Sequence, residues 1–121
     1  RQEIAAVYNG KPCLDVGLMT DVFSGYGKSD GIIRAVRCMS PDYIVTDELG
    51  ADAKSIRQAV NSGSGLIMTA HADSIEEAYR NEGIRTVIDS GAIQHIALVQ
   101  SHRITAVKQL ITAEANAVCT I

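Results

Sequence analysis

The chain has 121 residues, a mass of 12.9 kDa, 46% hydrophobic residues and a mean hydropathy of +0.08, which suits one domain or part of one and excludes a disordered tail. Eleven basic and fourteen acidic residues give a net charge of −3 without a basic cluster, and only 4% of residues are aromatic, which argues against a dedicated nucleic-acid binder. No apolar run reaches the roughly 18 residues of a membrane span, and three cysteines without a C-x-x-C pair suit a reducing compartment, so we expect a soluble intracellular protein.

The first third of the chain predicts a short strand, a long loop and a helix. Residues 3–8, apolar apart from Glu3, predict the strand, and residues 9–12 (Asn-Gly-Lys-Pro) carry turn chemistry. Residues 13–28 follow no period and predict a loop of a length that is usually functional or mobile. Ser29 can cap a helix over residues 30–39, which Pro41 ends.

The middle of the chain alternates strands and helices. Residues 43–46 and 66–70 are continuous apolar runs, which are typical of strands buried on both faces of a parallel sheet. A helix is predicted over residues 52–61, and Ser74 with Glu77 forms a capping box that opens another.

The last part predicts the end of that helix and three strands. A helical stripe, interrupted at Gly83, continues to Gly91, and residues 96–99 form a further apolar run. His102-Arg103 predicts a tight turn into a hairpin partner over 104–111, and residues 117–121 predict an edge strand. The fold class expected is α/β, with a largely parallel sheet flanked by helices and a C-terminal antiparallel hairpin.

Two chemical features fall at one edge of this predicted sheet. Asp47-Glu48 follows the first buried strand and His71 follows the second, and ligands bind at the carboxyl ends of such strands. A buried strand that delivers two acids is the Walker B arrangement of P-loop NTPases, in which the first carboxylate holds the Mg²⁺ shell through water and the second polarises the attacking water. Each feature alone is also common in strands and loops without catalytic function.

Several short blocks occur in order along the chain: Asp-Val-Gly at 15–17, Thr-Asp-Val at 20–22, Met-Ser-Pro at 39–41, Asp-Glu-Leu-Gly at 47–50 and Thr-Ala-His at 69–71. Through these blocks, roughly residues 1–101 resemble the secretion-ATPase superfamily of types II and IV, whose members are RecA-like P-loop NTPases. Within it, the chain is similar to the stage III sporulation protein AA family.

The resemblance implies a role for each matching residue. Glu48 is the catalytic glutamate, His71 the γ-phosphate sensor of the histidine box, and Asp47 the acid that holds Mg²⁺ through water. Thr69 and Arg37 are assigned with Asp47 to binding of ATP; the alternative for Arg37 is a place at the subunit interface or a solvated helix-face charge. The family also implies a ring-forming homo-oligomer, expected to be a hexamer. This ring would be cytoplasmic and peripheral to the membrane facing the mother cell, beside membrane proteins of a sporulation channel, with no direct nucleic-acid contact.

Two departures from the family pattern bear on this reading. Met19 stands where the family has arginine, and no G-x-x-x-x-G-K-[ST] motif occurs. Gly27-Lys28-Ser29 imitates the end of that motif, but Val22 occupies the position of its first glycine and a loop precedes it instead of a strand. We therefore expect residues 1–121 to be the C-terminal part of a RecA-like ATPase domain that lacks its P-loop strand, and to be inactive alone.

Two alternatives remain from the sequence. One is a nucleotide-free interaction module of the same fold. The other is an ATPase of the cyanobacterial and plastid type, which carries an appended single-stranded-nucleic-acid-binding domain.

Overall fold

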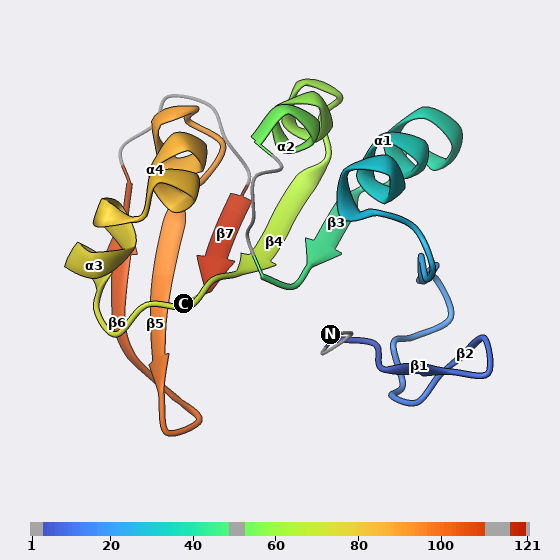
Figure 1. Cartoon of the computed structure of the whole chain (residues 1–121), viewed down its shortest axis with the longest axis horizontal. Helices are drawn as coiled ribbons and strands as arrows, with labels where there is room; N and C mark the ends of the chain where they lie inside the picture. Colours follow the sequence, from blue (N-terminus) through green and yellow to red (C-terminus); the bar gives the residue numbers. More distant parts are fainter. Residues whose placement is uncertain (1–3, 49–52, 111–116, 121) are drawn as a thin grey trace.

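A computed structural model describes residues 4–48, 53–110 and 117–120 of the chain, and these form a mixed α/β structure. A five-stranded sheet carries helices and is preceded by a small two-stranded sheet (Figure 1). The described elements are β1 (Val7–Tyr8), β2 (Lys11–Pro12), α1 (Lys28–Met39), β3 (Tyr43–Thr46), α2 (Ala53–Asn61), β4 (Gly65–Thr69), α3 (Ile75–Arg80), α4 (Glu82–Asp89), β5 (His95–Gln100), β6 (Arg103–Gln109) and β7 (Ala117–Thr120). The expected α/β class is confirmed at this level.

The main sheet has the strand order β3-β4-β7-β5-β6. The pairs β3–β4, β4–β7 and β7–β5 are parallel, and β5–β6 is antiparallel. The prediction of an edge strand near the C-terminus was therefore wrong, because β7 lies in the interior of the sheet between β4 and β5. A four-residue apolar run reveals a strand but not its neighbours, which are chosen by non-local pairing.

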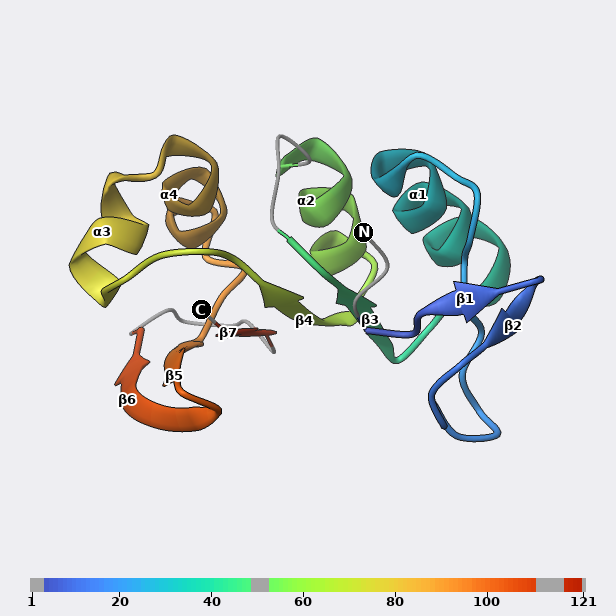
Figure 2. The same cartoon turned by 60° about the horizontal axis from the view of Figure 1, so that its bottom comes forward.

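The helices α1, α2 and α4 lie on one face of the sheet, as Figure 2 shows. On that side Ile44, Leu66 and Met68 are 8%, 1% and 0% exposed, whereas their strand neighbours Val45 and Ile67 are 51% and 39% exposed. The prediction of strands buried on both faces was wrong for this reason. Successive side chains of a strand point to opposite faces, and no described element covers the second face of β3 and β4.

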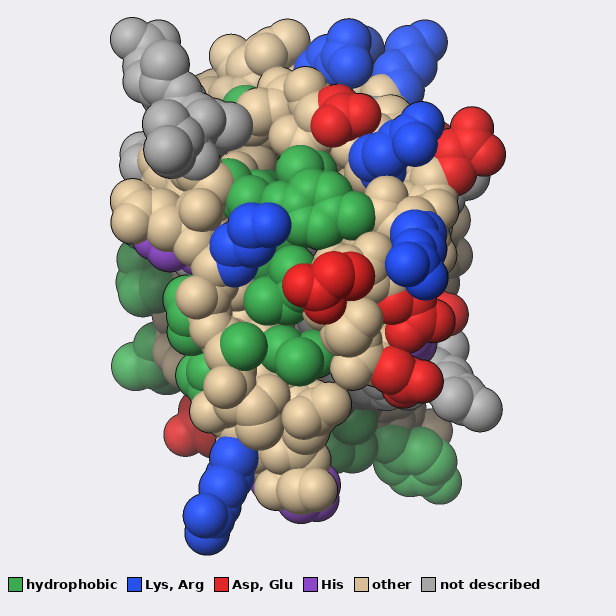
Figure 3. Space-filling view, turned by 90° about the vertical axis from the view of Figure 1, so that its left-hand side faces the viewer, with side chains coloured by type: hydrophobic (Ala, Val, Ile, Leu, Met, Phe, Trp, Pro, Cys, Tyr) green, Lys and Arg blue, Asp and Glu red, His purple; other side chains and the backbone are tan. Residues whose placement is uncertain are grey.

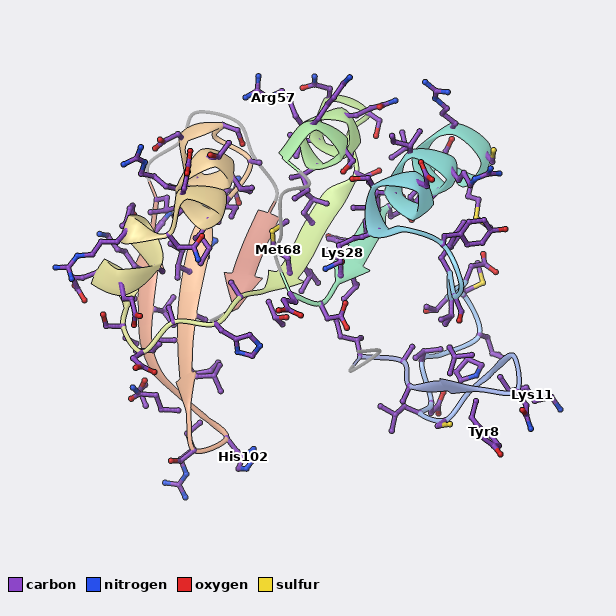
Figure 4. The ribbon with its side chains drawn as sticks, in the orientation of Figure 1. Tyr8, Lys11, Lys28, Arg57, Met68 and His102 are labelled. Carbon is purple, nitrogen blue, oxygen red and sulfur yellow. The ribbon has the colours of Figure 1, made fainter. Side chains whose placement is uncertain are left out.

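The core fills the layer between these helices and the sheet. It is aliphatic apart from Met68, which lies between β4 and the helical layer (Figure 4). The buried members are Ile32, Ile44, Ile56, Ala59, Leu66, Met68, Ala70, Ala78, Ile84, Val87, Ile88, Ala92, Ile93, Ile96 and Leu98. No helix in the described part of the chain combines the length and apolarity needed to cross a bilayer.

The helix boundaries follow local capping chemistry, with two corrections. The N-cap of α1 is Gly27, without a side-chain cap hydrogen bond, so Ser29 lies inside the helix and does not cap it. The Ser74 hydroxyl accepts from the Glu77 N–H at 3.1 Å, as predicted. The break between α3 and α4 falls at Asn81 instead of Gly83, because the Asn81 side chain accepts from two backbone N–H groups of the next helix.

The hairpins differ in how well the sequence predicted them. The hairpin between β5 and β6 is present as predicted, but its turn is Ser101-His102 and not His102-Arg103, because Arg103 already pairs with Gln100 as the first residue of β6. Ser101 and His102 have φ 49° and 61°, as a two-residue hairpin loop requires. The predicted N-terminal strand is only β1, which pairs with β2 and not with the main sheet. Asn9-Gly10 forms their turn, at φ 49° and 74°. Residues 13–27 contain no helix or strand, which confirms the predicted loop.

Candidate functional site

The candidate site lies where β3 and β4 end side by side. These strands run parallel with Thr46 opposite Met68, so the residues that follow them reach the same edge of the sheet. Asp47 is half-buried and Glu48 exposed directly after β3, and half-buried Thr69 ends β4. The sequence prediction that the acid pair and the Thr-Ala-His block share one edge rests on this parallel pairing, and the geometry agrees with it.

One hydrogen bond joins the two strand ends at Glu48, and a second lies within the end of β3. The Glu48 N–H donates to Oγ1 of Thr69 at 2.9 Å, and Oγ1 of Thr46 donates to the Asp47 carbonyl at 3.3 Å. Glu48 has φ 46°, a left-handed conformation that residues with a Cβ atom adopt rarely. The catalytic glutamate expected from the sequence thus sits on a fixed backbone between two strands.

Lys28 belongs to the same site and was missed as a functional residue by the sequence analysis. Its Nζ donates to the carbonyl of Asp47 at 2.5 Å and also to the carbonyl of Glu48. Figure 4 shows the side chain reaching from the start of α1 towards the strand ends. The charge of Lys28 could have indicated its role from the sequence. The helix dipole disfavours a cation in the first turn of a helix, so a lysine at that position suggests a contact outside the helix.

His71 and Arg37 take different places. His71 is exposed two residues beyond Thr69, at the same edge of the sheet. Arg37 is in the last turn of α1, about 13 Å along the helix axis from Lys28 at 1.5 Å per residue. Within one chain the structure therefore groups Asp47, Glu48, Thr69 and Lys28 with His71 nearby, and leaves Arg37 at the far end of α1.

The donor set at this edge fits a magnesium ion held mainly by water and phosphate. In the described part of the chain, no three His, Cys, Asp or Glu side chains come together to hold a metal ion. Asp47 and Glu48 nevertheless supply adjacent carboxylates, and Mg²⁺ bound with phosphates commonly uses only one or two. Gly27-Lys28-Ser29 does not complete a P-loop, because the segment before it forms no strand and Nζ of Lys28 binds carbonyl groups.

The face formed by α3, α4 and β6 does not resemble a binding surface of one charge sign. Figure 3 shows acidic and basic side chains mixed around an apolar area on this face. On it, Nζ of Lys108 lies 4.6 Å from the centre of the Tyr79 ring, a cation–π contact. The strand-end site is therefore the stronger candidate for function.

The fold and the strand-end residues together define the class: a mixed α/β protein with a paired-carboxylate site at the end of a parallel strand pair. The model of the family described as "Sporulation stage III, protein AA" matches residues 1–115, and the chain belongs to this family.

One curated relative is the stage III sporulation protein AA of Bacillus subtilis (strain 168), which is 29% identical over 94 residues. That match covers 76% of this chain and 31% of the relative, so the chain spans about a third of the length of the curated protein it matches. No solved structure matches the chain.

Proposed function

We propose that this chain is the hydrolysis half of a nucleotide site in a sporulation ATPase of the RecA-like P-loop type. The observation that carries the proposal is the acid pair Asp47-Glu48 at the end of β3, tied by the Glu48 N–H to Thr69 at the end of β4. The family supports a role in sporulation. The ATPase activity rests on the site and on the resemblance to secretion ATPases.

In this proposal each strand-end residue has one task. Asp47 would hold Mg²⁺ through water, and the bound ion would neutralise phosphate charge. Glu48 accepts a proton from the water that attacks the γ-phosphate. Thr69 has a hydroxyl proton to donate to a phosphate oxygen while its oxygen accepts from Glu48, and His71 senses the γ-phosphate.

The assembly and location belong to the same proposal. Arg37 lies at the opposite end of α1 from the acid pair, which suits a contact with the nucleotide or surface of a neighbouring subunit better than with its own. The protein would form a ring of identical subunits, expected to be hexameric, that is peripheral to the membrane facing the mother cell. There it would energise a secretion-like channel made by membrane proteins.

The test is ATP hydrolysis by the full-length protein and its Glu48→Gln variant. Loss of a general base costs about 10²- to 10⁴-fold in rate, so Glu48→Gln should lose hydrolysis by this factor and still bind ATP. Glu76→Gln is the matched control, because Glu76 is exposed on α3 away from the strand ends. Unchanged hydrolysis by Glu48→Gln would reject the catalytic assignment.

A second candidate is a nucleotide-free interaction module of the same fold. It is favoured by one observation, the lack of a G-x-x-x-x-G-K-[ST] motif in these 121 residues. Calorimetry separates the candidates: we expect micromolar ATP binding by the full-length protein and none by this chain alone. If the full-length protein binds no ATP, the interaction module is the better description; micromolar binding by this chain alone would contradict the assignment of the phosphate cradle to other residues.

A further inference from the structure

The backbone on both sides of the Glu48 Cα atom is held by side chains from other elements. The peptide between Asp47 and Glu48 is bound at its N–H by Oγ1 of Thr69 and at its carbonyl by Nζ of Lys28. The next carbonyl, that of Glu48, accepts from the same ammonium group. The relative orientation of these two peptide planes is set by φ and ψ of Glu48, so the contacts hold its left-handed backbone, which has φ 46°.

The position of Lys28 is not explained by the stability of its own helix. It is the first residue of α1, where a positive charge opposes the helix dipole, and the N-cap Gly27 adds no side-chain cap. Its half-buried side chain instead joins the start of α1 to the end of β3, across 19 and 20 residues of sequence. An ammonium group that bridges two successive carbonyls orients both.

We propose that Lys28 and Thr69 are positioning residues that hold Glu48 in the conformation required for hydrolysis. The proposal rests on the ATPase function proposed above. A general base must lie within about 2.6–3.2 Å of the water it activates, and a displacement of 1 Å costs about 100-fold in rate. Because the left-handed backbone sets the direction of the Glu48 Cα–Cβ bond, release of the backbone moves the carboxylate.

The kinetic test uses the full-length protein. We expect Lys28→Met and Thr69→Val each to lower kcat about 10- to 100-fold, and Lys28→Met to change the KM for ATP less than about twofold. Thr69→Ser keeps the hydroxyl oxygen and should restore the rate that Thr69→Val loses, and Lys28→Arg should restore part of the rate lost by Lys28→Met. Lys11→Met is the matched control, because Lys11 is exposed in β2, far from the strand ends (Figure 4).

A second measurement does not depend on hydrolysis. The Glu48 amide should exchange slowly with deuterium in the wild type and about 10-fold faster or more in Lys28→Met and Thr69→Val, since each releases one side of the same peptide. Lys11→Met should leave this exchange unchanged.

The outcomes separate the two proposals. Unchanged Glu48 exchange in both variants overturns the positioning role, whatever the ATPase rate. If the wild type does not hydrolyse ATP but the Glu48 amide exchanges faster in both variants, the ATPase function is overturned and the backbone contacts are established. A raised KM with an unchanged kcat in Lys28→Met overturns positioning in favour of a direct contact between Lys28 and the nucleotide.

Discussion

Replacing Leu66 by Ala should destabilise the fold more than replacing its neighbour Ile67 by Ala, although both changes remove three carbon atoms. Leu66 faces the helices and is 1% exposed, whereas Ile67 faces the uncovered side of β4 and is 39% exposed. Removal of three buried methylene-sized groups costs about 2.4 kcal/mol of transfer free energy. The enclosed cavity brings the loss for Leu66→Ala to about 3–4 kcal/mol. Because Ile67 is only about three-fifths buried, Ile67→Ala loses about three-fifths of this transfer free energy, about 1.5 kcal/mol. It leaves no enclosed cavity.

The assay is urea unfolding of this chain followed by far-ultraviolet circular dichroism, because the sequence has no tryptophan to report by fluorescence. Both variants should keep the wild-type dependence on urea and differ in midpoint. A difference between them below about 0.5 kcal/mol would refute the reasoning. It would mean that the second face of β4 is as well covered as the first.

Two further changes test local backbone chemistry by the same urea measurement. Asn81→Ala removes the acceptor for the N–H groups of Gly83 and Ile84 at 3.0 and 3.3 Å and should cost about 1 kcal/mol; an unchanged midpoint would show that α4 begins without this cap. His102 has φ 61°, a backbone conformation that costs less free energy for glycine than for a residue with a Cβ atom. Glycine also raises the chain entropy of the unfolded state, which offsets part of this gain, so His102→Gly should stabilise the hairpin by about 0.5 kcal/mol. A lower midpoint for that variant would show that the His102 side chain contributes more than its backbone conformation costs.

The position of the acid pair and the Thr-Ala-His block at one edge of the sheet was predictable from two things. These are the apolar runs that mark the strands and the rule that neighbouring parallel strands end at the same edge. Apolar runs before Asp47 and within residues 66–70 identify β3 and β4, and parallel neighbours bring their carboxyl ends to one edge. The capping role of Ser74 was predictable for the same reason, since its partner Glu77 is three residues away.

The predictions that failed depend on contacts between residues that are far apart in the sequence. An apolar run does not say which faces will be covered, so exposed Val45 looks like a core residue in the sequence. The contacts of Lys28 with Asp47 and Glu48 span 19 and 20 residues and depend on how α1 packs beside the sheet. Gly27-Lys28-Ser29 resembles the end of a phosphate-binding loop, whereas the ammonium group of Lys28 binds two backbone carbonyl groups.

The interior position of β7 has a consequence for the order in which the molecule is assembled. Among the described strands, β4 and β5 do not pair with each other, and Ala117–Thr120 lies between them and pairs with both. Because Ala117–Thr120 is the last of the described strands in chain order, the edges of β4 and β5 that face it have no partner strand until it has been synthesised. Such edges pair readily with other chains, and long-range pairing of this kind slows folding. The nascent chain is therefore most exposed to misassociation in the interval before its last described strand is made.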